Sequence, residues 1–302
     1  MKATALTGAY AASRSGSLVL AVLMAGCTPA LKPDLHYVLG NPYQAANVWY
    51  YPRESYDLDT TGLAAVFKGD TERLTADGEV FSQTGLAAAH PTVQLPAIAQ
   101  LTNLENGRAV VVRLNDRGPA DPHRLVEITQ RTADLLGIPQ GGVTRVRLRV
   151  LSAESHAAAD ALPGAPSLAL TAAPRGGVQV AELAPPPGVR QGNGRPLPAA
   201  PAAAAADGVA AAPSLRLPEA VTQTVPMAGQ LMVELDTFEE YHYAAVQRAR
   251  MAGYDARIVS MLDGRTRRYR VMVGPLADVA QADAVLDHAL ASGIPDARIV
   301  VN

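Results

Sequence analysis

A long stretch of the chain, residues 152–227, limits the fold more than any other feature because it cannot form a packed core. It includes segments such as ALPGAPSLALTAAP, AELAPPPGV and PLPAAPAAAAADGVAAAP, with many prolines and few bulky apolar side chains. Such a composition buries too little apolar surface to offset the conformational entropy lost on ordering. We therefore expect a disordered linker over residues 152–227, with a folded domain on each side.

Charge and composition exclude one broad class of function. The 302 residues carry a formal net charge of −2, and the sequence pI is about 6.3. Acidic and basic residues are mixed along the chain, so a basic face that binds nucleic acid is not expected. Hydrophobic residues reach 48%, but aromatic residues make up only 5% and much of the remainder is alanine, so the cores are smaller than the first figure indicates.

The first residues have the pattern of a bacterial export signal. Lys2 and Arg14 precede the apolar run SLVLAVLMAG, which is too short to span a bilayer, and Cys27 follows this run. Cys27 is the single cysteine, which excludes an intramolecular disulfide and a multi-thiolate metal site. We interpret residues 1–26 as a signal peptide with a lipobox and Cys27 as the lipidated residue, the alternatives being a cleaved secretory signal or a buried free thiol. Thr28 at the next position favours sorting to the periplasmic face of the outer membrane.

Two segments precede the linker. Residues 27–59 are rich in tyrosine and proline, and we expect them to pack as an arm on the domain that follows. Residues 60–151 contain the short runs GLAAVF, AIAQLTNL, AVVVRLN, RLVEIT and VTRVRLRVL, separated by Gly, Asn and Asp. These lengths and turn signals predict a compact, mainly β domain, a barrel or a sandwich. A helix is expected over residues 130–136, because Gly137 follows as a stop signal.

Residues 228–302 regain a regular hydrophobic pattern. The order is a strand (LMVEL), a helix over 239–252, two strands (ARIVSML and RYRVMVG), a helix over 278–291 and a last strand (ARIVV). The Asp-Gly pair at 263–264 is a hairpin signal between the two central strands. This βαββαβ order predicts an α+β, ferredoxin-like domain with a four-stranded antiparallel sheet backed by two helices.

Three polar residues before the linker lie where a scaffold can present side chains to a cleft. They are Glu79 in TADGE, His90 in AAAH and Asp116 in NDRGP, each at an expected turn or strand end. Cleavage of a glycosidic bond needs a carboxylic acid and a partner that tunes it or acts on the other side of the bond. Each residue also has a structural interpretation. Asp116 fits an amide-capping turn, Glu79 fits a solvated hairpin and His90 fits a satisfied, partly buried histidine.

The segments TADGE, AAH, TNLENGR, VVVRLNDRGP and RLVEIT closely resemble the rare lipoprotein A (RlpA) family, septal-ring lytic transglycosylases with a double-psi β-barrel. The upstream YVLGNPYQ and VWYYPRESYDLDTTGLA look like the leader region of the same family. The C-terminal YRVMVGPLADVAQADAVL is similar to the sporulation-related (SPOR) domain, which binds peptidoglycan glycan strands stripped of stem peptides. The resemblance implies a multidomain protein, a double-psi β-barrel and a SPOR domain joined by the disordered linker.

Carried over by position, the resemblance implies that Asp116, Glu79 and His90 form the active site. Asp116 would protonate the oxygen of the β-1,4 bond between N-acetylmuramic acid (MurNAc) and N-acetylglucosamine (GlcNAc). Its carboxylate would then help to remove the proton from the MurNAc C6 hydroxyl, which yields a 1,6-anhydro product without water. Glu79 and His90 would orient or tune the acid.

The resemblance also implies residues that contact the substrate. In the barrel these are Thr75, Asn115 and Arg117, and in the C-terminal sheet they are Gln230, Arg270 and Met272. Glu234 and Asp236 place acids near the expected glycan face, where the family more often has glutamine and glycine. The alternative is that this face is only a solvated surface.

One segment departs from the family pattern. The family has a serine, a tryptophan and a tyrosine just before the catalytic segment, whereas this chain has Ala65, Val66 and Phe67. If the aromatic pair of the family lines the cleft, sugar stacking is weaker here. If it belongs to the core, Val66 and Phe67 repack it.

The leading hypothesis is an endolytic lytic transglycosylase, lipid-anchored and acting on peptide-free glycan at the division septum. Its partners would be these glycan strands, the membrane through the anchor, and divisome proteins. A second hypothesis is a non-catalytic, peptidoglycan-binding septal lipoprotein with an expansin-like barrel, and a third is a hydrolase of another β-1,4 glycan. No cofactor or metal is expected, because the sequence has no phosphate-binding glycine loop, metal-ligand cluster or nucleophile-elbow serine.

Overall fold

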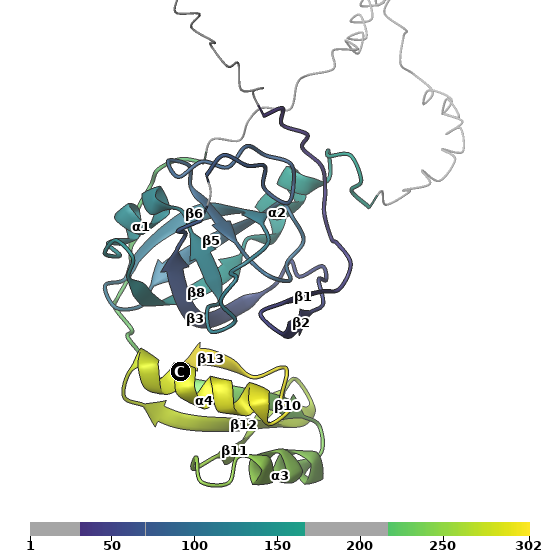
Figure 1. Ribbon diagram of the computed structural model, residues 1–302, viewed down its shortest axis with the longest axis vertical. Helices are drawn as coiled ribbons and strands as arrows, with labels where there is room; N and C mark the ends of the chain where they lie inside the picture. The colour runs from purple at the N-terminus through teal and green to yellow at the C-terminus, as the bar shows by residue number, and fades with distance from the viewer. Residues whose placement is uncertain (1–30, 70, 167–216) are drawn as a thin grey trace, which may run out of the picture. The chain divides into compact units, whose positions relative to one another are not determined.

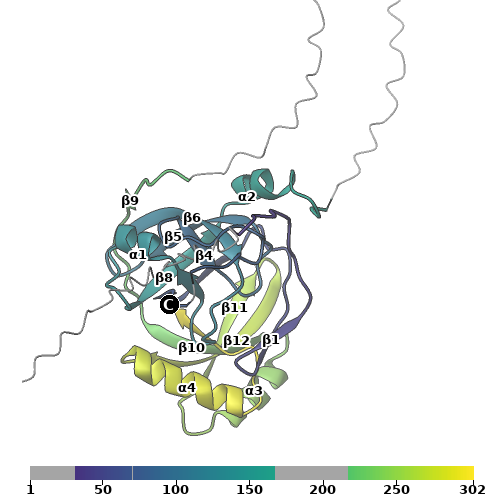
Figure 2. The same cartoon turned by 45° about the horizontal axis from the view of Figure 1, so that its top comes forward.

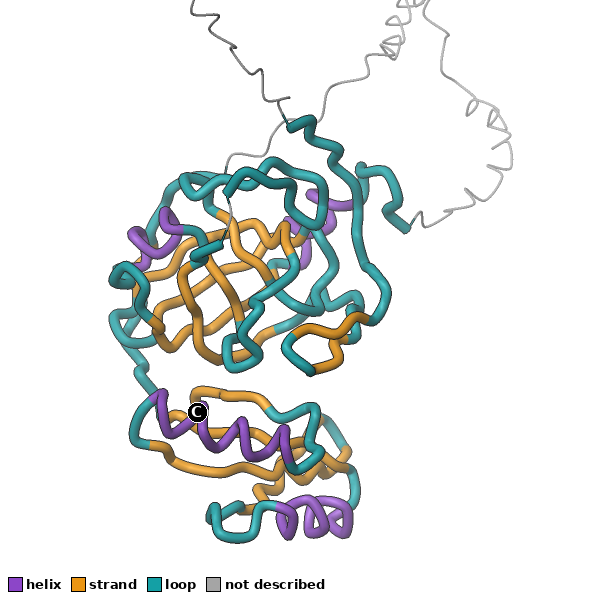
Figure 3. Tube along the Cα trace, in the orientation of Figure 1, coloured by secondary structure: helices purple, strands orange, loops and turns teal. Residues whose placement is uncertain are grey.

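A closed β-barrel forms the first folded region of the computed structural model, which describes residues 31–69, 71–166 and 217–302 (Figure 1). The strands follow the order β4-β7-β3-β8-β5-β6, and a pairing between β4 and β6 closes the ring. They are β3 (Asp59–Val66), β4 (Ala87–Ala89), β5 (Ala97–Asn103), β6 (Arg108–Asp116), β7 (Val126–Ile128) and β8 (Val143–Val150). The pairs β3–β7 and β4–β6 are parallel, and the others are antiparallel. Figure 3 shows these strands crossing one another inside a shell of loops.

Alternating side chains build the barrel core. In β8, Val146, Leu148 and Val150 are buried, whereas the arginines between them are exposed. This period of two is the pattern of a strand with one face in a core. Helix α1 (Gln130–Leu136) begins after Thr129 and ends at Gly137, whose φ of 68° is left-handed. The β-domain and its helix over residues 130–136 are therefore confirmed.

The arm packs on the barrel through backbone contacts. Strands β1 (Tyr43–Ala45) and β2 (Val48–Tyr50) form a hairpin, and Val38 makes a β-bridge with Leu95. Further along the chain, a Cβ placed on Gly78 would lie 1.9 Å from the carbonyl oxygen of Asp34. The arm therefore passes directly over the turn that contains Gly78, and glycine is required there.

The ordered chain extends into both ends of the predicted linker. Helix α2 (Ser152–Ala159) packs on β5, where the hydroxyl of Ser155 accepts from the amide of Ile98 (2.9 Å) and donates to its carbonyl (3.0 Å). Strand β9 (Thr222–Gln223) pairs with β6. Residues at both ends of the expected linker are therefore ordered, through contacts that an alanine-rich composition does not reveal. Residues 167–216 lie outside the described residues.

The C-terminal region has the expected βαββαβ order. Its elements are β10 (Leu231–Phe238), α3 (Tyr241–Arg250), β11 (Arg257–Asp263), β12 (Thr266–Leu276), α4 (Val279–Ala291) and β13 (Arg298–Val301). The strands form an antiparallel sheet in the order β11-β12-β10-β13. Both helices pack on one face of this sheet (Figure 2), where Val233, Val271 and Leu286 belong to one core. The ferredoxin-like prediction is confirmed.

The predicted signal peptide, residues 1–26, and Cys27 lie outside the described residues. A membrane-spanning helix needs about 20 apolar residues. Among the helices described, none is both long enough and apolar enough to cross a bilayer.

Candidate active site

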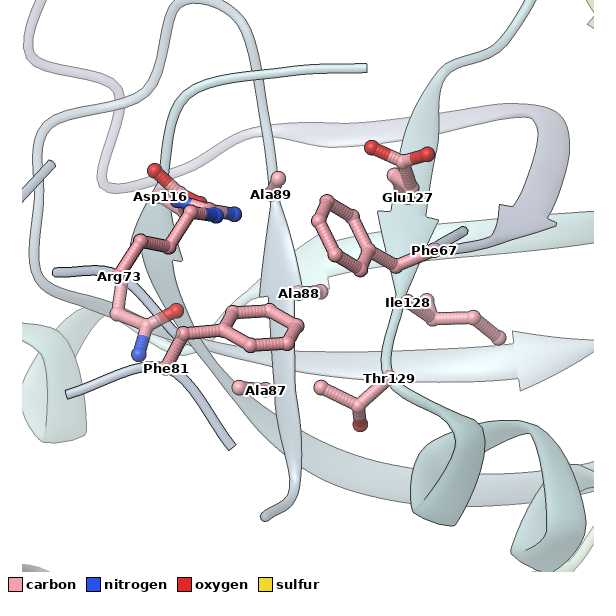
Figure 4. A pocket seen from close by; sticks show the side chains of 11 residues that line it. Phe67, Arg73, Phe81, Ala87, Ala88, Ala89, Asp116, Glu127, Ile128 and Thr129 are labelled. Atoms are coloured by element: carbon pink, nitrogen blue, oxygen red, sulfur yellow. The ribbon is translucent and has the colours of Figure 1, made fainter. Parts of the chain in front are cut away.

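A narrow pocket lies where β4, β6 and β7 run side by side (Figure 4). The three alanines of β4, Ala87 to Ala89, form its floor, and their small side chains leave room above the sheet. Aromatic rings and polar groups surround this floor. They belong to Phe67, Arg73, Phe81, Asn115, Asp116 and Glu127, with Ile128 and Thr129 completing the lining.

Asp116 ends β6 and presents its carboxylate to this pocket. One oxygen, Oδ2, lies 2.5 Å from Nη2 of Arg73. The other, Oδ1, accepts the backbone N–H groups of Ala76 (3.0 Å) and Arg117 (2.9 Å). All three contacts come from donors, which match an ionised, acceptor-only carboxylate. The carboxylate is therefore fixed in position before any substrate arrives.

Two phenylalanines form the aromatic wall of the pocket. The rings of Phe67 and Phe81 have centroids 4.6 Å apart, and the guanidinium carbon of Arg73 lies 5.0 Å and 4.7 Å from them. Val66, in contrast, is buried in the barrel core. The sequence left open whether this departure from the family pattern affects the cleft or the core. The structure places Val66 in the core and keeps an aromatic surface at the pocket through Phe67.

Glu79 reaches the pocket through Asn115. Its Oε2 accepts from Nδ2 of Asn115 at 2.6 Å, and its Oε1 lies 2.5 Å from Nε of Arg113. Asn115 itself lines the pocket, next to Asp116 in the chain. Glu79 therefore orients the Asn115 amide, and this amide is the group that faces the pocket.

Asp77 is a buried acid that the sequence interpretation missed. Thr75 donates its hydroxyl to Oδ1 of Asp77 (2.7 Å), whereas Oδ2 has no hydrogen-bond partner and lies 3.7 Å from Nη2 of Arg113. Burial, and then the charge of Glu79, raise the pKa of Asp77 to about 7. An Asp-Gly turn normally faces water, so local sequence gave no signal for this burial. Thr75, expected to bind substrate, caps this turn instead.

His90 is buried and neutral. Its Nδ1 accepts the backbone N–H groups of Thr92 and Val93, both at 3.2 Å, so we assign the proton to Nε2. Burial, reinforced by the charge of Arg117, lowers the pKa of His90 to about 3. Its backbone N–H donates to the carbonyl of Asp116 at 3.1 Å. His90 thus supports the strand end that carries Asp116, and its side chain is not among those lining the pocket.

Arg117 joins the arm to the loop after His90. Its Nη1 donates to the carbonyl of Val93 (2.5 Å), and its Nη2 donates to the carbonyl of Leu39 (2.7 Å). Burial lowers the pKa of this guanidinium. Arg117 was expected to contact substrate, but its donors are occupied by backbone carbonyls.

The three residues of the C-terminal region that were expected to contact glycan differ in their solvent exposure. Gln230 is exposed and Arg270 is partly exposed, but Met272 is 3% exposed and packs with Met232 and Val300. Met272 is therefore not available to a ligand.

The acids on this sheet are held by neighbouring groups. Glu234 lies 3.5 Å from Nε of Arg270 and 3.2 Å from Nη2 of Arg298. Burial raises the pKa of Asp236, and its carboxylate accepts the backbone N–H of Thr237 at 2.6 Å. Two arginines therefore neutralise the Glu234 carboxylate on the face where glycan was expected.

Within residues 31–69, 71–166 and 217–302, no three His, Cys, Asp or Glu side chains gather in a way that could hold a metal ion.

Comparisons with known proteins bear on the barrel. A family model described as lytic transglycolase matches residues 59–148, which contain the strands β3 to β8 almost entirely, and the expected double-psi β-barrel is confirmed. The chain is 31% identical over 125 residues to the endolytic peptidoglycan transglycosylase RlpA of Rickettsia bellii, covering 40% of this chain and 55% of that protein. It is 37% identical over 129 residues to the protein of the same name from Escherichia coli K12, covering 42% of this chain and 35% of that protein. The chain therefore spans about half, or less, of the length of these relatives.

A solved structure was also matched. The crystal structure of the RlpA SPOR domain from Pseudomonas aeruginosa is 17% identical, with a TM-score of 0.23. The match covers 24% of this chain and 99% of that chain.

Proposed function

Because a lytic transglycolase family model matches residues 59–148 and the relatives over this region are RlpA transglycosylases, we propose that this chain is a lytic transglycosylase of the rare lipoprotein A family that acts on peptidoglycan glycan strands. The observation that carries the proposal is the Asp116 carboxylate, fixed by three donors at the edge of a pocket with an alanine floor and aromatic walls. Apolar ring faces and a fixed carboxylate are the groups that a glycan-cleaving site requires.

The reaction requires a hydroxyl of the substrate as the nucleophile. The C6 hydroxyl of MurNAc attacks its own C1, the β-1,4 bond to GlcNAc breaks, and a 1,6-anhydro end forms. A fixed carboxylate such as Asp116 suits the removal of the C6 proton. Glu79 holds the neighbouring Asn115 amide toward the sugar, and His90 keeps the end of β6 in place.

The cellular setting is part of the same proposal. The substrate would be glycan strands free of stem peptides at the division septum, with the chain anchored to the outer membrane through Cys27. The C-terminal domain would act as a SPOR domain that brings the barrel to these strands. Arg270 and Arg298, at the partly exposed face of its sheet, supply donors for sugar hydroxyls.

Product analysis tests the activity. Amidase-denuded glycan strands are incubated with the chain from residue 28 onward, and the products are identified by mass spectrometry. We expect 1,6-anhydro-MurNAc ends from the wild type and from the control Asp134→Asn, which changes an exposed aspartate on α1. Asp116→Asn keeps the shape of the side chain but abolishes these ends. Reducing ends in place of anhydro ends would indicate a hydrolase and overturn the proposal.

One observation favours a second candidate, a barrel that grips glycan without cutting it. Both oxygens of Asp116 already have protein donors, and Arg73 lies across the carboxylate. Co-sedimentation separates the candidates. Binding to denuded strands with no product from the wild type would leave a glycan-binding protein, whereas anhydro products exclude it.

A further inference from the structure

A second carboxyl group, that of Glu127, lines the pocket from β7, two strands away from β6. Ala89 of β4 is the register partner of Asp116 in β6 on one side and of Glu127 in β7 on the other. Val126 and Ile128, on either side of Glu127, point into the barrel core, so Glu127 points outward. Figure 4 shows Asp116 and Glu127 on opposite sides of Ala89. Two inter-strand spacings of about 4.8 Å put their Cα atoms roughly 10 Å apart.

The two carboxyl groups have opposite surroundings. Asp116 accepts from three donors, whereas no hydrogen bond or ion pair joins the Glu127 carboxyl to any side chain in the described part of the protein. The space beside Glu127 is kept open by Gly118. A Cβ on Gly118 would lie 3.6 Å from Oε2 of Glu127 and 3.3 Å from Cβ of Ala89. Glu127 is thus open to a ligand in the pocket.

The same surroundings affect the protonation of Glu127. Glu127 is half-buried, and burial raises the pKa of its carboxyl above the usual value. The charge of Asp116 raises this pKa further, and Arg73 opposes the effect. Pairs of carboxyl groups in unlike environments are a common basis for assigning an acid and a base.

We propose that Glu127 is a second catalytic carboxyl group of this site and donates the proton to the leaving glycosidic oxygen, while Asp116 accepts the proton of the C6 hydroxyl. The inference rests on the proposed transglycosylase function and changes the role expected for Asp116, which would be the base and not the acid. The small side chain of Ala89 leaves room for the reacting bond between the two groups. Inverting glycosidases space their carboxyl groups in a similar way to admit a nucleophile.

The reaction balances without any other component. The bond from C1 to the leaving oxygen breaks, its electron pair stays on that oxygen, and the oxygen takes the proton of Glu127. O6 forms the new bond to C1 and loses its proton to Asp116. Transfer of one proton from Asp116 to Glu127 restores both groups, and no water is consumed.

Kinetics of the full chain from residue 28 test the role of Glu127. In Glu127→Gln, we expect kcat for anhydro-product formation to fall by about 10²- to 10⁴-fold, with a much smaller change in KM. The wild-type rate falls as pH rises through the pKa of Glu127, and the variant lacks this alkaline limb. Glu127→Asp restores a carboxyl and recovers part of kcat and the limb. The control is Glu154→Gln, on the exposed face of α2.

Each outcome has a defined meaning. Product from the wild type, with kcat and the alkaline limb unchanged in Glu127→Gln, overturns the role of Glu127 and leaves the proposed function intact. A loss of kcat in Glu127→Gln that Glu127→Asp does not relieve, with the alkaline limb retained, would make Glu127 a structural residue. No product from the wild type overturns the proposed function and the inference with it.

Discussion

Two glutamates of this molecule occupy similar places in their sheets and have opposite environments. Glu234 in the C-terminal sheet is 5% exposed, and its Oε1 lies within 3.5 Å of both Arg270 and Arg298. Glu127 in the barrel is less buried, faces a second carboxylate and has no such partner among the described side chains. A strand position alone therefore does not decide what a glutamate does. The charges across the neighbouring strands decide it.

The difference predicts a structural role for Glu234 and a catalytic role for Glu127. A buried carboxylate that is matched by cations stays ionised and adds to the specificity of packing. A half-buried carboxyl beside a like charge retains its proton more readily, and this proton can be transferred. If the contrast holds, changes at paired acids alter stability and changes at Glu127 alter activity.

The largest expected effect comes from removing a cation that pairs with barrel acids. Arg113→Met leaves Glu79 and Asp77 close together without their partner, so we expect the free energy of unfolding to fall by about 3–5 kcal/mol at pH 7.5. Urea titration followed by the fluorescence of Trp49, the single tryptophan, measures this change. Arg149→Met, at an exposed position of β8, is the matched control. If Arg113→Met lowered the free energy of unfolding no more than the control does, the pairing of Arg113 with Asp77 and Glu79 would not stabilise the barrel.

The next effect concerns pH. The pKa of Asp77 is raised to about 7 in the folded chain, against about 3.9 unfolded, so the folded state binds more protons between these values. Stability from this group is therefore complete below pH 4 and is lost as pH rises through 7. Asp77→Asn removes that loss, on the order of 3 kcal/mol at most. Urea titrations of both proteins at pH 4.5 and 7.5 measure it, and His90 contributes equally to both. If the free energy of unfolding changed by the same amount between pH 4.5 and 7.5 in both proteins, the result would contradict the assigned pKa of Asp77.

A smaller effect is expected in the C-terminal sheet. Glu234→Gln leaves Arg270 and Arg298 facing each other, and since these side chains are 31% and 56% exposed, we expect a loss of only about 1–2 kcal/mol. Hydrogen exchange of peptides from β10 and β12 reports this loss locally. Glu240→Gln, at an exposed position before α3, is the control. Unchanged exchange in these peptides would remove the contrast between the two glutamates.

The smallest effect on the free energy of unfolding is expected at Glu127. Glu127→Gln breaks no hydrogen bond or ion pair of the described structure and removes a repulsion with Asp116, so we expect the free energy of unfolding to change by no more than about 0.5 kcal/mol. The same Trp49 fluorescence titration measures it. A fall above about 1.5 kcal/mol would assign Glu127 to the structural class, together with Glu234.

Much of the fold was predictable because it depends on local patterns. The alternation in VTRVRLRV predicts β8, and Gly137 predicts the end of α1 at the correct residue. The position of Asp116 beside a pocket also follows from its place at a strand end. These features need only the neighbouring residues of the chain.

The pairing of Asp116 with Glu127 could not be predicted in this way. It depends on β4 lying between β6 and β7 and on the register of Ala89 with both, and no local pattern specifies either. The burial of Asp77 depends on the arm, because Asp34 and His36, more than 40 residues earlier in the sequence, hydrogen-bond to the turn at Asp77 and Gly78. Arg117 has the charge of a substrate-binding residue, but the sequence does not show that its guanidinium donates its hydrogen bonds to backbone carbonyls in the folded chain.

The crossing of the arm over Gly78 also affects where a fragment containing the barrel can be cut. The family model matches residues 59–148, but the backbone of Asp34 covers the Asp77 turn, and Ser155 in α2 completes the hydrogen bonds of Ile98. A fragment cut at the limits of the match would expose the Asp77 carboxyl to water and leave an edge of β5 unsatisfied. The packed barrel therefore extends at least from residue 34 to residue 159, and the limits of the family match are narrower than the physical domain.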